Sequence, residues 1–373
     1  MKPSWTLRRY REGDEHAIVE LARRFPAFGT GYTLDYWNWK YKRNPAGSSI
    51  IWLAERDGQI IGHYSLVPVL LKVGNAYVRG AFGSDAATHP NHQGQGVYSD
   101  LVNRCSLDAA DHDIPISYGL SQVNLGPTYK RYERIGHICF MTHLIKVLDW
   151  KAALDRYIEN EFAKSAISSI LRMILRPRTP PSHNMQIEEV SRFDDRVDEF
   201  WTEISERFTV IVRRDQKYLN WRYVDHPGQK YTVYAAVNGH RVLGYCAVRI
   251  GTARGRRREK VLSVAFIDDI LALDCEIVGS LVRSTVSRFE EQGVDAIACT
   301  MSQGHAYRAA FMKAGFVTFL RRFSDINLAL YAAVNLPGTS IDQERAYSQS
   351  LILSQSHFLK ERRNWFLMSG DNL

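Results

Sequence analysis

The chain has 373 residues, 45% of them hydrophobic and 24% charged, which is the composition of a globular protein with room for two domains. Its formal charge of +8 favours anionic partners such as nucleotides, CoA or phospholipid, without choosing among them. No apolar run reaches the roughly 18 residues that cross a bilayer, no signal-peptide core is present, and the five cysteines include no C-x-x-C pair. We therefore expect a cytoplasmic protein with reduced thiols, no transmembrane segment and no metal.

The first 150 residues predict strands and helices in a hairpin-rich order, from hydrophobic alternation, turn residues and helical spacing. The strands are expected at Thr6–Tyr10, Ile50–Glu55, Gln59–Pro68, Val69–Gly80, Ala81–His89, Ile116–Ser121 and, as a pair, within Cys139–Val147. The helices are expected at Glu12–Phe25, Val97–His112 and a short segment that ends at Tyr132. This pattern predicts an α/β (α+β) fold with a mixed, mainly antiparallel sheet flanked by helices.

An internal repeat divides the chain. The box Tyr36-Trp37-Asn38-Trp39-Lys40-Tyr41 returns 182 positions later as Tyr218-Leu219-Asn220-Trp221-Arg222-Tyr223. Three further pairs keep the same offset without a gap: Pro45 and Pro227, Ala54 and Ala236, and Gly62 and Gly244. A register held over nearly thirty residues predicts two copies of one fold.

The repeat predicts four segments along the chain. We expect a catalytic domain over residues 1–150, a helix with a Pro-rich linker over 151–184, a second copy over 185–335, and a C-terminal extension over 336–373. The linker is placed at Pro177–His183, where prolines break a helix. The segment before it, Lys151–Leu175, has helical spacing; it can pack on the first domain or lie on a membrane surface.

The segment Gly83–Leu101 carries the clearest chemical signal. A strand ends at Pro90, a turn with Gly94 and Gly96 follows, and a helix begins at Val97. Glycines let such a turn present consecutive backbone N–H groups, and the helix N-terminus adds a positive dipole end, so phosphate is the expected guest. No lysine follows Gly96, which excludes a P-loop, and the hairpin order of the preceding strands argues against a dinucleotide fold. A plain strand–turn–helix connection is the alternative.

This segment resembles motif A of the GNAT acyltransferase superfamily, a strand followed by a proline and then Q/R-x-x-G-x-G/A. Tyr98 departs from the small residue usual there. The resemblance implies acetyl-CoA as the cofactor and backbone pairing of its pantetheine arm with Ala87 and Thr88. It also implies a pyrophosphate cradle made by Gln93, Gly94, Gln95, Gly96, Val97 and Tyr98.

A second segment resembles motif B of the same superfamily, in which an Asn is followed by a short helix and a Tyr-x-x-x-Gly ending. Here Asn124 follows a predicted strand, and Tyr132 stands four residues before Gly136. The resemblance implies that Asn124 and Tyr129 lie at the cofactor, and that Tyr132 is the general acid that protonates the departing CoA thiolate. Core packing is the alternative role for this tyrosine.

Acyl transfer to an amine needs a neutral nucleophile, because an alkyl ammonium has a pKa of about 10.4. Asp85, on the motif A strand, is the expected base, with His63 and His89 as weaker candidates. A hydrogen-bonded strand-end carboxylate is the alternative for Asp85. Trp39 and His63 are expected to line the acceptor pocket, although the repeated aromatic box can equally be a core staple.

The second copy lacks the pyrophosphate cradle, because Leu271–Cys275 between its predicted strand (Val261–Ile270) and helix (Glu276–Gln292) contains no glycine turn. Phe311 stands four residues before Gly315, as Tyr132 does before Gly136, and a phenylalanine cannot donate a proton. We expect a degenerate copy that stabilises the first or helps to shape the acceptor site.

Together these observations predict an acyl-CoA-dependent N-acetyltransferase that acts by direct transfer on a small-molecule amine, such as an amino sugar. Two alternatives stay open: a non-catalytic acyl-CoA-binding or scaffold protein, and an aminoacyl-tRNA-dependent peptidyl transferase of similar fold. No nucleic-acid module accompanies the basic run at 254–258, so no nucleic-acid partner is expected. The sequence leaves the oligomeric state open.

Overall fold

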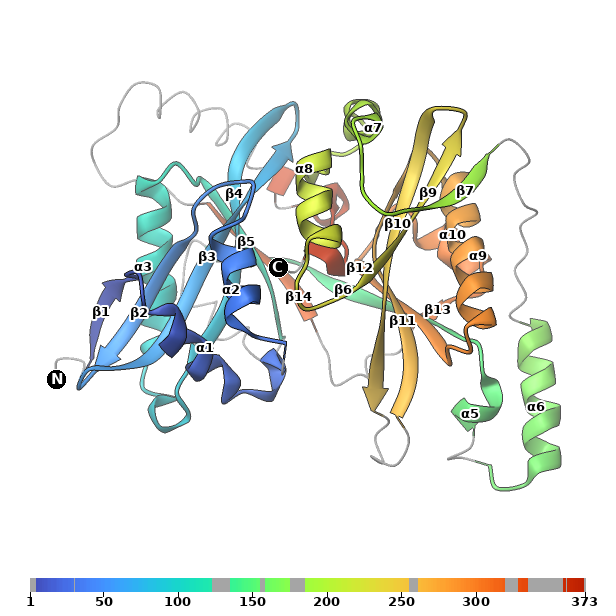
Figure 1. Cartoon of the computed structure of the whole chain (residues 1–373), viewed down its shortest axis with the longest axis horizontal. Helices are drawn as coiled ribbons and strands as arrows, with labels where there is room; N and C mark the ends of the chain where they lie inside the picture. The colour runs from blue at the N-terminus through green and yellow to red at the C-terminus, as the bar shows by residue number, and fades with distance from the viewer. Residues whose placement is uncertain are drawn as a thin grey trace.

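The computed structural model describes residues 5–29, 31–122, 135–154, 158–174, 185–254, 261–318, 328–334, 358–359 and 361–371. Its main feature is one long, mostly antiparallel sheet that runs through both halves of the chain, with helices packed on it (Figure 1). This confirms the predicted mixed α/β class. None of the described helices is long and apolar enough to cross a membrane.

The first half supplies the strands at one end of the sheet. Its elements are β1 (Thr6–Arg9), α1 (Glu15–Arg23), α2 (Leu34–Tyr41), β2 (Ile50–Arg56), β3 (Gln59–Val73), β4 (Ala76–Thr88), α3 (Val97–Asp111) and β5 (Ile116–Gln122). Strands β1 to β4 are antiparallel neighbours, and β4 pairs with β5 in parallel. Alternate residues of β2 pack on opposite sides: Trp52 belongs to the apolar cluster under α3, and Leu53 to the main core with α1 and α2.

The three strands expected between Gln59 and His89 are in fact two long ones. Pro68 lies inside β3, where it faces Ala81 of β4, so it does not end the strand. The chain reverses instead between Val73 and Ala76, which pair with each other across the hairpin. Gly74, in the loop between them, has a φ of +59°. A short hairpin loop of this kind needs a residue that tolerates positive φ, which glycine does.

The middle of the chain also differs from the prediction. Cys139–Val147 is not a pair of strands but part of one strand, β6 (Ile135–Val147), and the helix expected over 151–175 is divided into α5 (Trp150–Leu154) and α6 (Glu161–Ile174). The short helix expected to end at Tyr132, and the Pro-rich linker at Pro177–His183, lie outside the described residues.

The second half supplies the other end of the sheet. Its strands are β7 (Gln186–Val190), β8 (Val210–Val212), β9 (Tyr231–Asn238), β10 (Arg241–Arg254), β11 (Val261–Ala272), β12 (Ala296–Ser302), β13 (Val317–Thr318), β14 (Leu328–Val334) and β15 (Trp365–Phe366). Its helices are α7 (Arg196–Ser205), α8 (Gln216–Leu219) with a π-helical turn at Asn220–Val224, α9 (Cys275–Glu291) and α10 (Arg308–Lys313).

The two halves exchange strands in the middle of the sheet. Strand β14, late in the sequence, is inserted between β5 and β6, and β6 of the first half pairs with β12 of the second. A boundary at residue 150 therefore does not separate two closed sheets. The shared strands join the halves through backbone hydrogen bonds as well as through side-chain packing.

The repeat seen in the sequence lies on matching strands. Ala54 of β2 pairs with Gly62 of β3, and Ala236 of β9 pairs with Gly244 of β10. Both glycines are packed closely: a Cβ on Gly62 would stand 2.7 Å from the side chain of Val97, and one on Gly244 would stand 2.5 Å from that of Ala272. The same cross-strand pair thus recurs for the same packing reason.

Candidate functional site

The turn after β4 has the conformation that its glycines predict. The N–H of His89 still donates to the backbone oxygen of Ile61 on β3 (2.8 Å), and a 3-10 helix follows at Pro90–His92. Gly94 and Gly96 then have φ values of +73° and +101°, and Gly96 directly precedes α3. Only glycine adopts such angles without strain, so the local backbone depends on both positions.

The turn presents free amide groups to solvent. Within the described part of the chain, the backbone N–H groups of Gly94, Gln95 and Gly96 donate no hydrogen bond, and all three residues are exposed. Val97 and Tyr98 begin α3, whose N-terminus adds the positive end of the helix dipole. These amides and the helix dipole together make the turn suited to an anion such as a phosphate.

Strands β4 and β5 separate beside this turn. Their parallel pairing extends only from Gly80–Ile116 to Phe82–Tyr118, although β4 continues to Thr88 and β5 to Gln122. On its other edge β4 remains paired with β3, where Ala87 faces His63 and Thr88 faces Gly62. Among the described residues, the edge of β4 toward β5 therefore has no strand partner over the positions expected to bind pantetheine.

Asp85 lies in a β-bulge of β4. His63 of β3 pairs with Ala87, and Ser65 pairs with Ser84. Two residues of β4, Asp85 and Ala86, therefore lie opposite the single residue between His63 and Ser65. Asp85 has a φ of +53°, an uncommon angle for a residue other than glycine. The bulge turns the carboxylate toward α2 and the segment before it.

The carboxylate of Asp85 accepts three strong hydrogen bonds. The Lys40 Nζ donates at 2.8 Å, the Tyr41 hydroxyl at 2.6 Å and the Tyr32 hydroxyl at 2.8 Å. The Lys40 side chain is 1% exposed and that of Asp85 is 9% exposed, so this is a buried ion pair.

The ion pair keeps both groups charged. Burial alone would raise the pKa of Asp85, but the Lys40 ammonium and the Tyr41 hydroxyl outweigh it, and the pKa lies below its usual value. Burial alone would lower the pKa of Lys40, but the attraction of Asp85 outweighs it, and the pKa is raised. A carboxylate with a lowered pKa and occupied oxygens is a weak proton acceptor. This arrangement suits Asp85 to positioning better than to proton abstraction.

His63, next to Asp85, has a ring nitrogen that can act as a base. Its Nδ1 lies 2.7 Å from the backbone oxygen of Asp85, and because a carbonyl can only accept, Nδ1 carries the proton. The Nε2 then has a lone pair, and it is buried without a hydrogen-bond partner among the described residues. Burial lowers the pKa of His63, which keeps the ring neutral. A neutral imidazole with an unused lone pair can accept a proton.

The other expected site residues divide into two groups. Trp39 is 1% exposed and packs between the two halves, where its ring stacks on that of Trp221. Tyr132, Asn124 and Tyr129 lie outside the described residues, so their expected roles stay predictions.

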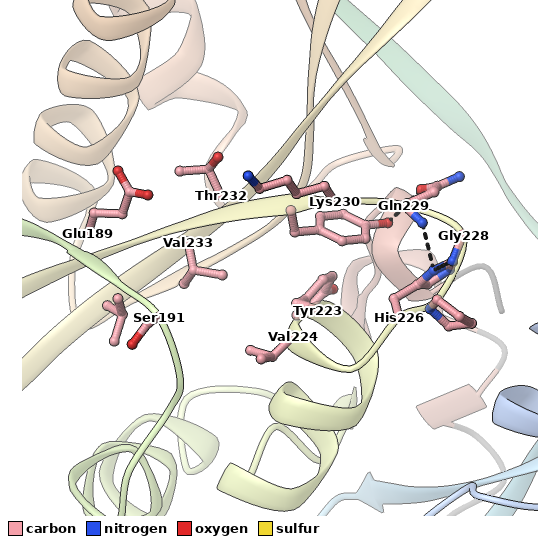
Figure 2. Close-up of a pocket in the computed structure, with 13 residues that line it drawn as sticks. Glu189, Ser191, Tyr223, Val224, His226, Gly228, Gln229, Lys230, Thr232 and Val233 are labelled. Carbon is pink, nitrogen blue, oxygen red and sulfur yellow. Dashed lines mark hydrogen bonds between the residues drawn. The ribbon is translucent and has the colours of Figure 1, made fainter.

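A pocket of about 540 Å³ lies in the second half, between the end of β7 and the loop before β9 (Figure 2). In Figure 2, Glu189 and Ser191 line one end of it and His226 the other. The Nδ1 of His226 accepts hydrogen bonds from the backbone N–H groups of Gly228 and Gln229, both at 3.1 Å. Burial, with the nearby Arg222, lowers the pKa of His226 to about 3, so the ring is neutral. Tyr223 and Pro227 of this pocket belong to the repeat, but no residue of the pocket was predicted to have a functional role.

The residues around Asp85 were missed, although the sequence contains a signal for them. Lys40 and Tyr41 are the last two residues of the repeated box, where the second copy has Arg222 and Tyr223. A buried cation and a hydroxyl recurring at the same two positions indicate a buried anion nearby in each copy. Only the structure identifies Asp85 as that anion in the first half.

Comparisons with known proteins agree with this geometry. Solved structures similar to the chain include a GCN5-related N-acetyltransferase from Anabaena variabilis (TM-score 0.61, 11% identity, 88% of this chain and 72% of that one). They also include a probable N-acyltransferase from Enterococcus faecalis (0.61, 12%, 89% and 73%) and the N-myristoyltransferase of Saccharomyces cerevisiae with bound myristoyl-CoA (0.61, 12%, 90% and 81%). At such identities the likeness is one of fold.

Comparison with curated protein sequences gives no match. The family model for the acetyltransferase (GNAT) domain matches residues 6–136, the part that contains the glycine turn, the bulge at Asp85 and the separation of β4 from β5. Residues 6–136 of this chain therefore belong to the GNAT acetyltransferase domain family.

Proposed function

We propose that the chain is an acyl-CoA-dependent acyltransferase that transfers an acyl group, acetyl by default, directly to an amine of a small molecule. One observation carries the proposal: the free amides of Gly94, Gln95 and Gly96 lie directly after the strand edge that β5 leaves unpaired. CoA has a pyrophosphate that needs such amides and a pantetheine arm with amide groups that can pair with a strand edge.

The proposed cofactor contacts follow this order along the chain. Gln93 to Tyr98 hold the pyrophosphate, and Ala87 and Thr88 pair with pantetheine. Two observations support this placement. Ala87 and Thr88 are bonded to β3 on one edge only, and the Nε2 of Gln93 donates to the backbone oxygen of Thr88 (3.2 Å), which fixes the turn against the strand.

In the proposed reaction the acceptor nitrogen attacks the thioester carbon, the new C–N bond forms and the C–S bond breaks. The nitrogen loses a proton and the sulfur gains one. We assign the proton on nitrogen to the Nε2 of His63, directly or through water, and the proton for sulfur to Tyr132. Asp85, which the sequence suggested as the base, holds Lys40 and the two tyrosine hydroxyls and presents its backbone oxygen to His63.

The acceptor and the acyl chain are the open parts of the proposal. An amino sugar is the acceptor that we would try first, on the tandem arrangement that the repeat suggests. The similar structure of N-myristoyltransferase contains myristoyl-CoA, so long-chain donors belong in the same test.

The test is a turnover assay that follows the release of free CoA thiol from acetyl-, octanoyl- and myristoyl-CoA in the presence of a panel of amines. We expect thiol release that depends on an amine and is strongly reduced in Tyr132→Phe. Cofactor binding without turnover on any amine would favour the non-catalytic binding protein. Absence of cofactor binding, with transfer from aminoacyl-tRNA, would favour the peptidyl transferase.

A further inference from the structure

Strands β11 and β12 of the second half separate in the same way as β4 and β5. Their parallel pairing extends only from Val264–Ala296 to Ile267–Cys299. Beyond that point β11 continues to Ala272 and β12 to Ser302 without pairing to each other. The second half therefore has an opening between two parallel strands.

The side chains beside the two openings correspond. Asp269 follows a bulge in β11, as Asp85 lies in a bulge of β4. The Tyr223 hydroxyl donates to Asp269 at 3.0 Å, as the Tyr41 hydroxyl donates to Asp85 at 2.6 Å, and these tyrosines end the two copies of the box. The opening between β11 and β12, which we call the second opening, is thus the counterpart of the proposed cofactor opening.

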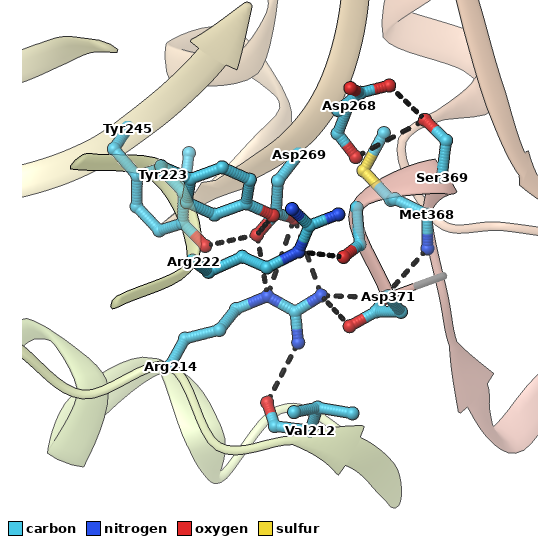
Figure 3. Close-up of polar contacts among 12 residues, drawn as sticks. Val212, Arg214, Arg222, Tyr223, Tyr245, Asp268, Asp269, Met368, Ser369 and Asp371 are labelled. Carbon is cyan, nitrogen blue, oxygen red and sulfur yellow. Dashed lines mark hydrogen bonds and ion pairs between the residues drawn. The ribbon is translucent and has the colours of Figure 1, made fainter. Parts of the chain in front are cut away.

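The C-terminal segment Trp365–Asp371 lies in the second opening. On the β12 side, Ser302 donates its backbone N–H to the oxygen of Leu367 (3.0 Å) and its hydroxyl to the oxygen of Trp365 (2.9 Å). On the β11 side, the Ser369 hydroxyl donates to the carboxylate of Asp268 (2.9 Å), as Figure 3 shows. The segment therefore bridges the two strands that do not pair with each other.

Buried charges fix the end of the segment. Arg214 lies between two carboxylates: its Nη2 donates to Asp371 at 2.8 Å and its Nε donates to Asp269 at 3.0 Å (Figure 3). The side chains of all three are at most 2% exposed. The box residue Arg222 donates from its Nε to the oxygen of Gly370 at 2.9 Å. Arg222 occupies the box position that Lys40 has in the first copy. In the second half this cation thus bonds to the backbone of the segment.

The segment fits the second opening closely. A Cβ on Gly370 would stand 2.2 Å from the Tyr223 hydroxyl and 2.8 Å from the backbone oxygen of Asp268, so only glycine fits there. The four residues from Trp365 to Met368 are each at most 3% exposed. Burial of this much apolar surface stabilises the docked segment strongly.

We propose that the segment Trp365–Asp371 is a ligand that the chain supplies to itself: it fills the second opening and restricts the chain to one acyl-CoA site, in the first half. The inference rests on the proposed function for the role of the first opening. It agrees with the second half's lack of a glycine turn between β11 and α9, since an opening that is permanently occupied needs no phosphate cradle.

The segment also touches the first opening. The Trp365 ring lies 5.7 Å from that of Tyr118, the last residue of β5 that pairs with β4 before the strands separate. Strand β15 pairs with β8, and β8 pairs with the end of β3. One segment thus closes the second opening and supports a wall of the first.

The test uses the full chain and two measurements. Calorimetric titration with acetyl-CoA counts the sites, and hydrogen–deuterium exchange follows residues 361–371 with and without saturating acetyl-CoA. We expect one site per chain and the same slow exchange of the segment in both conditions. Gly370→Ala should raise exchange across the segment by about tenfold or more, because the added methyl group cannot fit. Arg363→Ala, an exposed position in the same region, is the matched control and should leave exchange unchanged.

Leu367→Ala is a second variant for the case that Gly370→Ala fails to fold, since it weakens the packing of a buried side chain without a clash. Two acetyl-CoA molecules per chain, or faster exchange of the segment when acetyl-CoA is bound, would overturn the proposal. So would unchanged exchange in both variants. If the wild-type chain binds no acetyl-CoA, the proposed function fails, and the exchange of the variants still decides whether the segment fills the second opening.

Discussion

Trp39 and Trp221 stack with their ring centroids 4.7 Å apart, and each donates its indole N–H to the backbone oxygen of the other, at 2.8 Å and 3.0 Å. The two residues are 182 positions apart, which is the offset of the sequence repeat. Contacts in which equivalent residues exchange equivalent bonds are the mark of a twofold relation. We infer that a local pseudo-twofold axis passes between these rings and relates the two copies of the box.

The first prediction concerns this reciprocal pair. Trp39→Phe keeps an aromatic ring but leaves the buried oxygen of Trp221 without its donor, and Trp221→Phe does the same to Trp39. Each change should lower the free energy of unfolding by about 1–3 kcal/mol, measured by urea denaturation. The two losses should be of similar size if the pseudo-twofold relation holds, and very different losses would contradict it.

Trp37→Phe is the matched control. Trp37 is also 1% exposed and lies on the same helix, but its indole N–H has no partner among the described residues. Its replacement loses no hydrogen bond, so the free energy of unfolding should fall by less than in Trp39→Phe. An equal loss would show that ring size, and not the exchanged hydrogen bonds, sets the cost.

The second prediction concerns the ion pair of Lys40 and Asp85. Lys40→Met leaves a buried carboxylate without its cation, which should cost about 3–5 kcal/mol of unfolding free energy at neutral pH. The double variant Lys40→Met with Asp85→Asn should recover part of this loss, because no charge is then left unpaired. Equal stability of the single and double variants would contradict the buried ion pair.

The loss of unfolding free energy in Lys40→Met should depend on pH in a definite direction. In the wild type the lowered pKa of Asp85 contributes stability above its unfolded value of about 3.9, and this contribution is lost as pH falls. Without Lys40 we expect the pKa of Asp85 to lie above the unfolded value. The deficit of Lys40→Met should then shrink as the pH falls toward about 4. Urea denaturation at several pH values measures this.

The third prediction concerns Asp371. Burial, partly offset by Arg214 and reinforced by Asp269, raises the pKa of Asp371 to about 6. Asp269, the neighbouring carboxylate, accepts hydrogen bonds from the hydroxyls of Tyr223 and Tyr245. Protonated Asp371 contributes fully to the unfolding free energy below the pKa of about 3.9 that it has in the unfolded chain. This contribution is lost as the pH rises through about 6.

Asp371→Asn removes this titration. The unfolding free energy of the variant minus that of the wild type should rise as the pH increases from about 4 to about 6 and then level off, because in this range unfolding of the wild type alone releases the proton of Asp371. A difference that does not change with pH would mean that Arg214 keeps Asp371 ionised throughout this range.

The fourth prediction concerns His63. His63→Asn can still donate to the backbone oxygen of Asp85 but has no lone pair at the Nε2 position, so kcat should fall by about 10²–10⁴-fold while the Kd for acetyl-CoA is unchanged. Because the pKa of His63 is lowered, the wild-type rate should not fall as the pH drops through the ordinary imidazole value of about 6.5. A variant with wild-type kcat would exclude His63 as the base.

Local sequence patterns predicted the parts of the fold that depend on neighbouring residues. The turn at Gly94 and Gly96, the helix that starts at Val97 and the repeated box all have short-range signals, and the structure contains each of them. The GNAT resemblance is confirmed for residues 6–136. The division into two GNAT-like domains and the roles of the site residues stay predictions.

Features that depend on distant partners could not be predicted in this way. The insertion of β14 between β5 and β6 joins segments about two hundred residues apart, and alternation along one strand does not specify its neighbour. The charge state of Asp85 depends on Lys40, which is 45 positions away, and the contact of Asp371 with Arg214 spans 157 positions. Pro68 is a strand end by local pattern alone, but in the sheet it pairs with Ala81 of β4, a partner that neighbouring residues do not specify.

The most direct test of the central claim is a calorimetric titration with acetyl-CoA of the wild type, Gly96→Glu and Gly13→Glu. Gly13 is the matched control, because it has the same φ of +101° and the same open surroundings as Gly96 but lies outside the turn. If the turn holds the CoA pyrophosphate, the wild type and Gly13→Glu bind acetyl-CoA, and Gly96→Glu loses binding through carboxylate–phosphate repulsion. Equal binding by all three proteins, or by none, would contradict a cofactor site at this turn.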